Sequence, residues 1–172
     1  MLVKTACLRS ILLFCLSFLA ACAGDVSKPT PVQALSATQQ NSLHTSDVTA
    51  EAKPGLTVAS YDIDRIIQNV KAELAKVELA RPQGAAGSTA KIKLILTEYD
   101  KGNAFARAMM AGLGQIKIDA DVIFIDDATG GEIARYKVSK DFAFGGIYGA
   151  STGMEDVEQG FAKSVAEILK KD

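Results

Sequence analysis

The sequence predicts an α+β domain with a mostly antiparallel sheet of about four strands and two long helices packed on one face. Three segments, 91–99, 115–126 and 132–142, alternate apolar and polar residues as half-buried strands do. Two others, 62–80 and 153–170, carry apolar residues at three- and four-residue steps, which is the spacing of an amphipathic helix. Because the second and third strands are joined by only a short turn, they must pair as a hairpin.

The chain begins with an export signal. Residues 1–10 contain Lys4 and Arg9 and no acidic residue, and residues 11–21 are an apolar run that ends in small residues. This arrangement is typical of a secretory signal peptide. The run is shorter than the roughly 20 residues that a membrane-spanning helix needs. We therefore expect residues 1–21 to be removed from the mature protein.

The segment Leu19-Ala20-Ala21-Cys22 resembles the lipobox of bacterial lipoproteins. The resemblance implies cleavage before Cys22 and attachment of fatty chains, such as palmitate, to its thiol and its new amino group. Several chains together anchor a protein durably, whereas one chain alone does so only marginally. An ordinary secreted protein cut near Ala21 or Ala23 is the alternative.

The residue after the lipobox cysteine also carries information. In lipoproteins of this type an Asp at that position favours retention in the inner membrane, and this chain has Ala23. In a bacterium with an outer membrane, the resemblance therefore implies anchoring in the inner leaflet of that membrane, with the domain facing the periplasm. The membrane is thus the first expected partner, through the acyl chains on Cys22.

Composition excludes several classes of function. The chain has 19 basic and 20 acidic residues, and loss of Lys4 and Arg9 leaves a net charge of −3. A chain with this charge lacks the excess of basic residues that is typical of nucleic-acid-binding proteins. Cys7 and Cys15 leave with the signal, so the folded part has no disulfide and no cysteine-based metal site. The one histidine, His44, lies in a polar stretch. We therefore expect no catalytic, cofactor-binding or metal-binding residues, and a protein that is not an enzyme.

Residues 22–53 are predicted to be the lipidated cysteine followed by a flexible tether. They are rich in Ser, Thr, Gln, Ala and Pro and show no apolar period, so they bury too little surface to offset the entropy of ordering. About thirty such residues reach roughly 110 Å when taut. A single α+β domain is expected over 54–172, with a short first strand at 55–60 and a helix at 62–80.

A short helix is predicted over 104–111, with Asn103 as its N-cap. A helix of this length is not stable alone, so it must pack against the rest of the domain. Arg107 is its one charged residue. It has two interpretations: a ligand for an anion, or a structural arginine at the edge of the core. In the second, its charge is paired with an aspartate such as Asp100, because long buried charges usually require a partner.

The hairpin has a defined expected register. A three-residue loop with Gly130 in the left-handed conformation is a common closure for the turn after Asp126. Counting outward from it pairs Lys117 with Asp141 and Asp121 with Lys137 on one face. On the other face the expected pairs are apolar. Asp119 and Asp121 are accordingly interpreted as cross-strand charge partners and not as an acid–base pair.

A glycine-rich segment with aromatic residues, 142–153, precedes the last helix. Both this segment and residues 104–113 adjoin the same end of the hairpin, so we expect them to meet there. The resulting apolar surface is either an interaction site or a plug for the end of the core. Its predicted members are Arg107, Met110, Leu113, Phe144, Ile147 and Tyr148.

Gly102, Asn103, Arg107, Gly112 and Gly114, with the Asp-Asp-Ala-Thr-Gly turn at 126–130, resemble a family of bacterial lipoproteins catalogued as a domain of unknown function (number forty-four ten). The resemblance covers most of residues 94–170 and implies an envelope lipoprotein without a known activity. The function expected first is an interaction or assembly module that contacts envelope proteins or itself. A periplasmic protein that binds a small ligand or a glycan, with Arg107 in a deep pocket, is the alternative.

Overall fold

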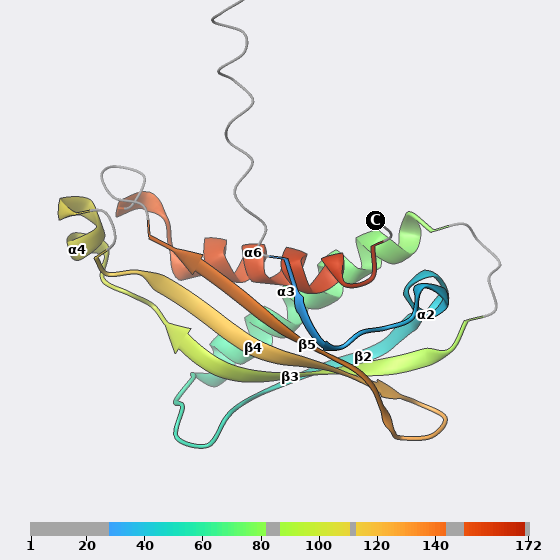
Figure 1. Ribbon diagram of the computed structural model, residues 1–172. Helices are drawn as coiled ribbons and strands as arrows, with labels where there is room; N and C mark the ends of the chain where they lie inside the picture. The colour runs from blue at the N-terminus through green and yellow to red at the C-terminus, as the bar shows by residue number, and fades with distance from the viewer. Residues whose placement is uncertain (1–27, 82–86, 111–112, 144–149, 171–172) are drawn as a thin grey trace, which may run out of the picture.

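The computed structural model describes residues 28–81, 87–110, 113–143 and 150–170. Its strands and helices follow one another in the order shown in Figure 1. The strands are β1 (Thr30–Gln33), β2 (His44–Ala52), β3 (Thr89–Asp100), β4 (Ile116–Asp126) and β5 (Glu132–Phe142), and the helices are α2 (Ala37–Ser42), α3 (Ser60–Leu79), α4 (Ala104–Met109) and α6 (Met154–Glu167).

The strands form one sheet in the order β1-β5-β4-β3-β2. Three of the four neighbouring pairs are antiparallel, and β2 runs parallel to β3. The two long helices α3 and α6 lie side by side on one face of this sheet (Figure 1). The α+β class is therefore confirmed, but the described part of the sheet has five strands where about four were expected, and one pair is parallel.

The prediction of a tether up to residue 53 is wrong for residues 30–52. They contain β1, α2 and β2, and Leu35, Leu43 and Val48 are buried in the core. The polar composition misled the prediction because both strands lie at sheet edges and bury few side chains. Residues 28–53 accordingly belong to the described domain, and the first strand expected at 55–60 is not a strand.

One parallel strand pair in the described sheet is joined by a helix. The strand before α3 is β2, and α3 carries the chain across to β3. Helix α3 buries one apolar stripe that includes Ile66, Val70 and Leu74. Helix α6 likewise buries Val157, Phe161 and Val165 against the sheet. Together these stripes and one face of the sheet make a single hydrophobic core.

The expected hairpin register is confirmed from Lys117 to Phe124. It shifts by one residue between Phe124 and Ile125, so the pairing next to the turn differs from the expected three-residue closure. Lys117 pairs with Asp141, Asp121 with Lys137, and the apolar pair Val122 with Tyr136 faces the helices. Gly130 has a φ of 69°, as the turn requires. The register matters for function because it fixes which segments meet at each end of the sheet. The turn at 127–131 lies at one end, and α4 and the start of α6 lie at the other (Figure 1).

Candidate functional site

A closed loop between β3 and β4 carries α4. The backbone N–H of Asn103 donates to the carbonyl of Gly114 at 3.1 Å, which joins the two ends of the loop. Gly102 and Gly114 both have positive φ. A Cβ on Gly114 would stand 2.3 Å from the carbonyl oxygen of Asn103, so only glycine fits this closure. The side chain of Asn103 caps α4 by accepting from Ala106 N–H at 3.0 Å, as predicted.

Arg107 holds the inner side of α4. Its side chain is 3% exposed, although α4 itself projects from the fold. The guanidinium donates to the carbonyl of Gly114 at 2.7 Å and to the carbonyl of Thr152 at 3.1 Å. Thr152 lies just before α6, so this one side chain joins the loop of α4 to the segment that leads into the last helix. The contacts described for Arg107 support its structural interpretation, with backbone carbonyls as partners where an aspartate such as Asp100 was expected.

The outer side of α4 exposes large apolar side chains. Their exposed fractions are high: Phe105 75%, Met109 69%, Met110 61% and Leu113 51%. We call these four residues the α4 tip. Single exposed apolar residues are common on proteins, but a group of four within nine positions is a patch of the kind that marks interaction sites.

The predicted surface is only partly described by the structure. Met110 and Leu113 are exposed at the α4 tip, and Arg107 lies beneath it as a buried support. Phe144, Ile147 and Tyr148 lie outside the described residues. The expected meeting of the two segments at one end of the sheet is seen in the contact between Arg107 and Thr152. Phe105 and Met109 belong to the exposed group as well.

A buried group of charged residues supports the same end of the sheet. Glu158 of α6 is fully buried, and its carboxylate accepts hydrogen bonds from the guanidinium of Arg65 on α3. The hydroxyl of Tyr99, near the end of β3, donates to the same carboxylate at 2.6 Å. Three elements are thus joined through one carboxylate. Burial, together with this carboxylate acceptor, raises the pKa of Tyr99 well above its usual range.

A second buried carboxylate completes the group. Asp62 contacts Arg65 at 2.6 Å and the ammonium of Lys101 at 2.8 Å. Burial alone would raise the pKa of Asp62, but the bonds to the two cations outweigh it and hold the pKa below its usual value. Lys101 directly precedes the loop that carries α4. The group therefore anchors the base of the α4 tip to both long helices.

This group was not predicted, because charged residues between the apolar positions of an amphipathic helix usually form its solvated face. One signal was present: Asp62 and Glu158 occupy positions within the buried stripes of α3 and α6. A carboxylate in such a stripe needs partners, since an unpaired buried charge is strongly unfavourable. The part of Tyr99 in this group could not be predicted from the sequence. A register shift between Leu96 and Glu98 turns Tyr99 toward the helices, and strand alternation does not predict it.

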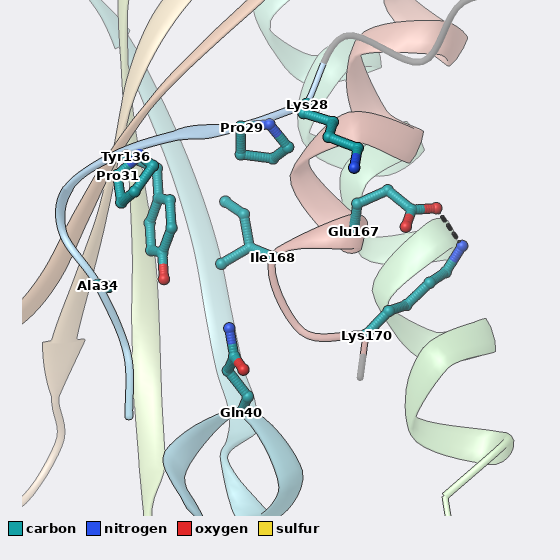
Figure 2. Close-up of a pocket in the computed structure, with 9 residues that line it drawn as sticks. All are labelled: Lys28, Pro29, Pro31, Ala34, Gln40, Tyr136, Glu167, Ile168 and Lys170. Carbon is teal, nitrogen blue, oxygen red and sulfur yellow. Dashed lines mark hydrogen bonds and ion pairs between the residues drawn. The ribbon is translucent and has the colours of Figure 1, made fainter. Parts of the chain in front are cut away.

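A cleft lies at a different place, between β1 and the end of α6. Its volume is about 430 Å³. Figure 2 shows Tyr136 and Ile168 in its interior and an ion pair between Glu167 and Lys170 at its rim. The hydroxyl of Tyr136 accepts the backbone N–H of Leu35, so it is already used in holding β1. Neither Arg107 nor any residue of the α4 tip lines this cleft, so the cleft and the α4 tip are separate sites.

Nowhere in residues 28–81, 87–110, 113–143 and 150–170 do three or more His, Cys, Asp or Glu side chains gather as they would around a metal ion. Within these ranges no helix combines the length and apolar character needed to cross a bilayer. Asp119 and Asp121 are engaged on the open face of the sheet, where Asp119 accepts from Ser139 at 2.5 Å and Asp121 lies 3.8 Å from Arg135.

Residues 31–146, about two thirds of the chain, match the model of a protein family described as "Domain of unknown function (DUF4410)". The chain belongs to this family. The DUF4410 match starts inside β1 and so includes the residues that were expected to form a tether. The glycine, asparagine and arginine positions on which the resemblance was based are those that close the α4 loop, apart from Gly112, which lies outside the described residues.

Solved structures share the fold of this DUF4410 protein. The PelC dodecamer from Paraburkholderia phytofirmans is similar in two crystal forms. A PelC variant matches with a TM-score of 0.55 and 11% identity, over 83% of this chain and 95% of that one. The second form matches with a TM-score of 0.52 and 8% identity, over 84% and 100%. At these identities the likeness establishes the fold alone.

A minor lipoprotein from Acinetobacter baumannii is more distant. Its TM-score is 0.37 at 12% identity, with 70% of this chain and 89% of that one covered. No curated protein has a significantly similar sequence.

Proposed function

We propose that this DUF4410 protein is a lipid-anchored protein of the bacterial cell envelope that works by contact and not by catalysis. Acyl chains on Cys22 hold it in a membrane, and in a bacterium with an outer membrane this is the inner leaflet, with the domain facing the periplasm. The α4 tip is its contact surface. The observation that carries the proposal is the exposure of Phe105, Met109, Met110 and Leu113 on a loop that the fold holds firmly.

The way the loop is held supports a functional surface. A plug for the core would turn its large apolar side chains inward and leave its charge outside. The α4 loop does the reverse, because Arg107 is buried and Met109 is exposed. Placing four large apolar side chains in water is unfavourable, at about 25 cal/mol for each Å² of apolar surface. A contact that covers them in the envelope recovers this free energy.

Assembly of several copies is part of the proposal. PelC, whose fold is similar, forms a dodecamer. A shared fold does not carry assembly with it, so the oligomeric state needs its own measurement. Native mass spectrometry of the mature protein in mild detergent reports it directly. Discrete oligomers support an assembly module, and a monomer at all concentrations restricts the contacts to the membrane and other proteins.

The anchoring is tested on protein isolated from cells. Intact mass spectrometry should find a mature chain that begins at Cys22 with diacylglyceryl and amide-linked acyl groups. The variant Cys22→Ser should incorporate no labelled palmitate and should accumulate as a precursor or a released protein. Ala23→Ser keeps the lipobox cysteine and serves as the matched control. A mature amino terminus other than acylated Cys22 would refute the anchoring.

The alternative function, binding of a small ligand or a glycan, no longer depends on Arg107, since that guanidinium is bound to carbonyl groups. It depends instead on the cleft in Figure 2, whose volume is within the range of ligand sites. That cleft is lined as much by charged and polar residues as by apolar ones, and its tyrosine hydroxyl is engaged by β1. The exposed tip therefore favours the contact function.

A further inference from the structure

We infer that the α4 tip inserts into the lipid surface that holds Cys22, so that the domain rests on the bilayer through this end. The inference deepens the proposed function and rests on it, because it takes Cys22 as the anchor. It names lipid as the partner of the tip. It follows from three features: the length of chain between the anchor and the domain, the direction in which that chain leaves the domain, and the withdrawal of charge from the loop.

The connection to the anchor is short. The described domain begins at Lys28, only six residues after Cys22. Six residues span at most about 20 Å even when fully extended. A tether of thirty residues would have let the domain stand clear of the membrane in any orientation. With six, the part of the domain around Lys28 must stay close to the bilayer, and one side of the molecule faces the lipid.

The chain enters the sheet beside the middle of β5. Strand β1 runs antiparallel to β5, and Thr30 pairs with Lys137. Residues that precede Thr30 therefore lie toward the later part of β5, which ends at Phe142 beside Ile116 and the α4 loop. In agreement, Lys28 lines a depression together with Ser139. From Lys137 to Phe142 is only about 17 Å along a strand. Lys28 also lies near Glu167 at the end of α6 (Figure 2), so the chain enters about midway along the sheet. The connection of about 20 Å is long enough for Cys22 to lie level with the α4 tip.

The loop is built without outward charge. Residues 102–115 contain one charged residue, Arg107, and it is buried against two backbone carbonyls. The exposed residues of α4 are Ala, Phe and Met. Charged groups are expensive to bring into the apolar part of a bilayer, whereas Phe, Met and Leu enter it readily. A protein-docking surface has no such requirement, since interfaces usually carry a polar and charged rim.

The shape agrees with a lipid partner. Figure 1 shows α4 projecting beyond the ends of β3 and β4, at the opposite end of the sheet from the turn at 127–131. A projecting knob enters a lipid surface without needing a complementary cavity. Peripheral elements of this kind lie about 5–10 Å deep, at the boundary between headgroups and acyl chains. Four of the large apolar side chains that are exposed among the described residues belong to the α4 tip, which fits this placement.

The chain offers a direct test because it contains no tryptophan. Phe105→Trp places a single fluorophore in the α4 tip, and Ala128→Trp places one in the exposed turn at the opposite end as a matched control. The full mature chain, from Cys22 onward, retains one cysteine and can be coupled through it to a maleimide lipid. Vesicles of phosphatidylethanolamine and phosphatidylglycerol with brominated acyl chains then quench any tryptophan that enters the apolar layer.

We expect the emission of Phe105→Trp to shift to shorter wavelength on the vesicles and to be quenched several-fold more strongly than that of Ala128→Trp. Equal quenching of the two variants overturns the inference. A shift that appears without lipid and grows with protein concentration also overturns it, because a second copy would then cover the tip. Failure of the anchoring is separate: an unacylated Cys22 in protein from cells refutes the proposed function, whatever the vesicles show.

Discussion

Arg107 Nη1 lies 2.7 Å from the carbonyl oxygen of Gly114, so the one charge of the α4 loop closes the loop from inside. Arg107→Met removes this bond and the bond to Thr152, so that among the described residues only the N–H of Asn103 still donates to the carbonyl of Gly114. We expect the free energy of unfolding to fall by about 3 kcal/mol. Phe105→Ser, on the exposed side of the same helix, should change it by less than about 0.5 kcal/mol. Urea unfolding measures both, and equal midpoints for the two variants would contradict this role.

Gly114 is expected to tolerate no side chain. Gly114→Ala combines a left-handed backbone, which costs about 1–2 kcal/mol for alanine, with a Cβ 2.3 Å from the carbonyl oxygen of Asn103. Gly130→Ala has the same backbone cost, but nothing lies within 4 Å of its Cβ. Thermal unfolding should therefore show a clearly larger loss for Gly114→Ala. A loss no greater than that of Gly130→Ala would mean that the closure adapts to the methyl group.

The carboxylate of Glu158 is expected to dominate the buried charged group. Glu158→Ala leaves the guanidinium of Arg65 and the hydroxyl of Tyr99 without their shared acceptor, and about 3–5 kcal/mol of stability should be lost. Tyr99→Phe removes one bond to a charged acceptor and should cost about 2 kcal/mol. Glu155→Ala, one turn earlier and largely exposed, is the control. The order Glu158, Tyr99, Glu155 is the test, and any reversal argues against the network.

Asp62 predicts a dependence on pH. Its pKa in the folded protein is below the usual 3.8, because the bonds to Lys101 and Arg65 outweigh the effect of burial. The ionised carboxylate thus stabilises the fold above that pH, and this contribution is lost as pH falls through the lower folded-state pKa. The stability advantage over Asp62→Asn should be constant from about pH 5 to 8 and should shrink below about pH 4. An advantage that persists or grows in acid would refute the assignment.

Periodicity predicted the regular elements where one face is buried. The register of β4 and β5 followed from Gly130 and from alternation, because a slip by one residue would bring opposite faces together. The edge strands β1 and β2 were missed because neither has a fully buried face that would produce such an alternation. Most of the side chains of His44–Ala52 are at least partly exposed, so no alternation marks the strand, and its place depends on pairing with β3. Local sequence patterns do not predict long-range strand pairing of this kind.

The site was predicted in part. The α4 loop, its Asn103 cap and the importance of Arg107 followed from local sequence, because caps and lone charges act within a few residues. The carbonyl partners of Arg107 did not, since Thr152 is 45 positions away. The buried group around Glu158 needed the packing of α3 on α6 and the irregular register near Glu98. Neither is accessible before the fold is known.

The contact surface itself is tested most directly by methionine oxidation. Met109 and Met110 are exposed at the α4 tip, whereas Met154 is 7% exposed, and oxidation by peroxide follows exposure. The reaction is compared in intact envelopes and in the purified mature chain with Cys22→Ser. We predict that sulfoxide formation at Met109 and Met110 is several-fold slower in envelopes, while Met154 reacts slowly in both. Oxidation of Met109 and Met110 at the same fast rate in both samples would contradict the claim that the tip is covered where the protein works.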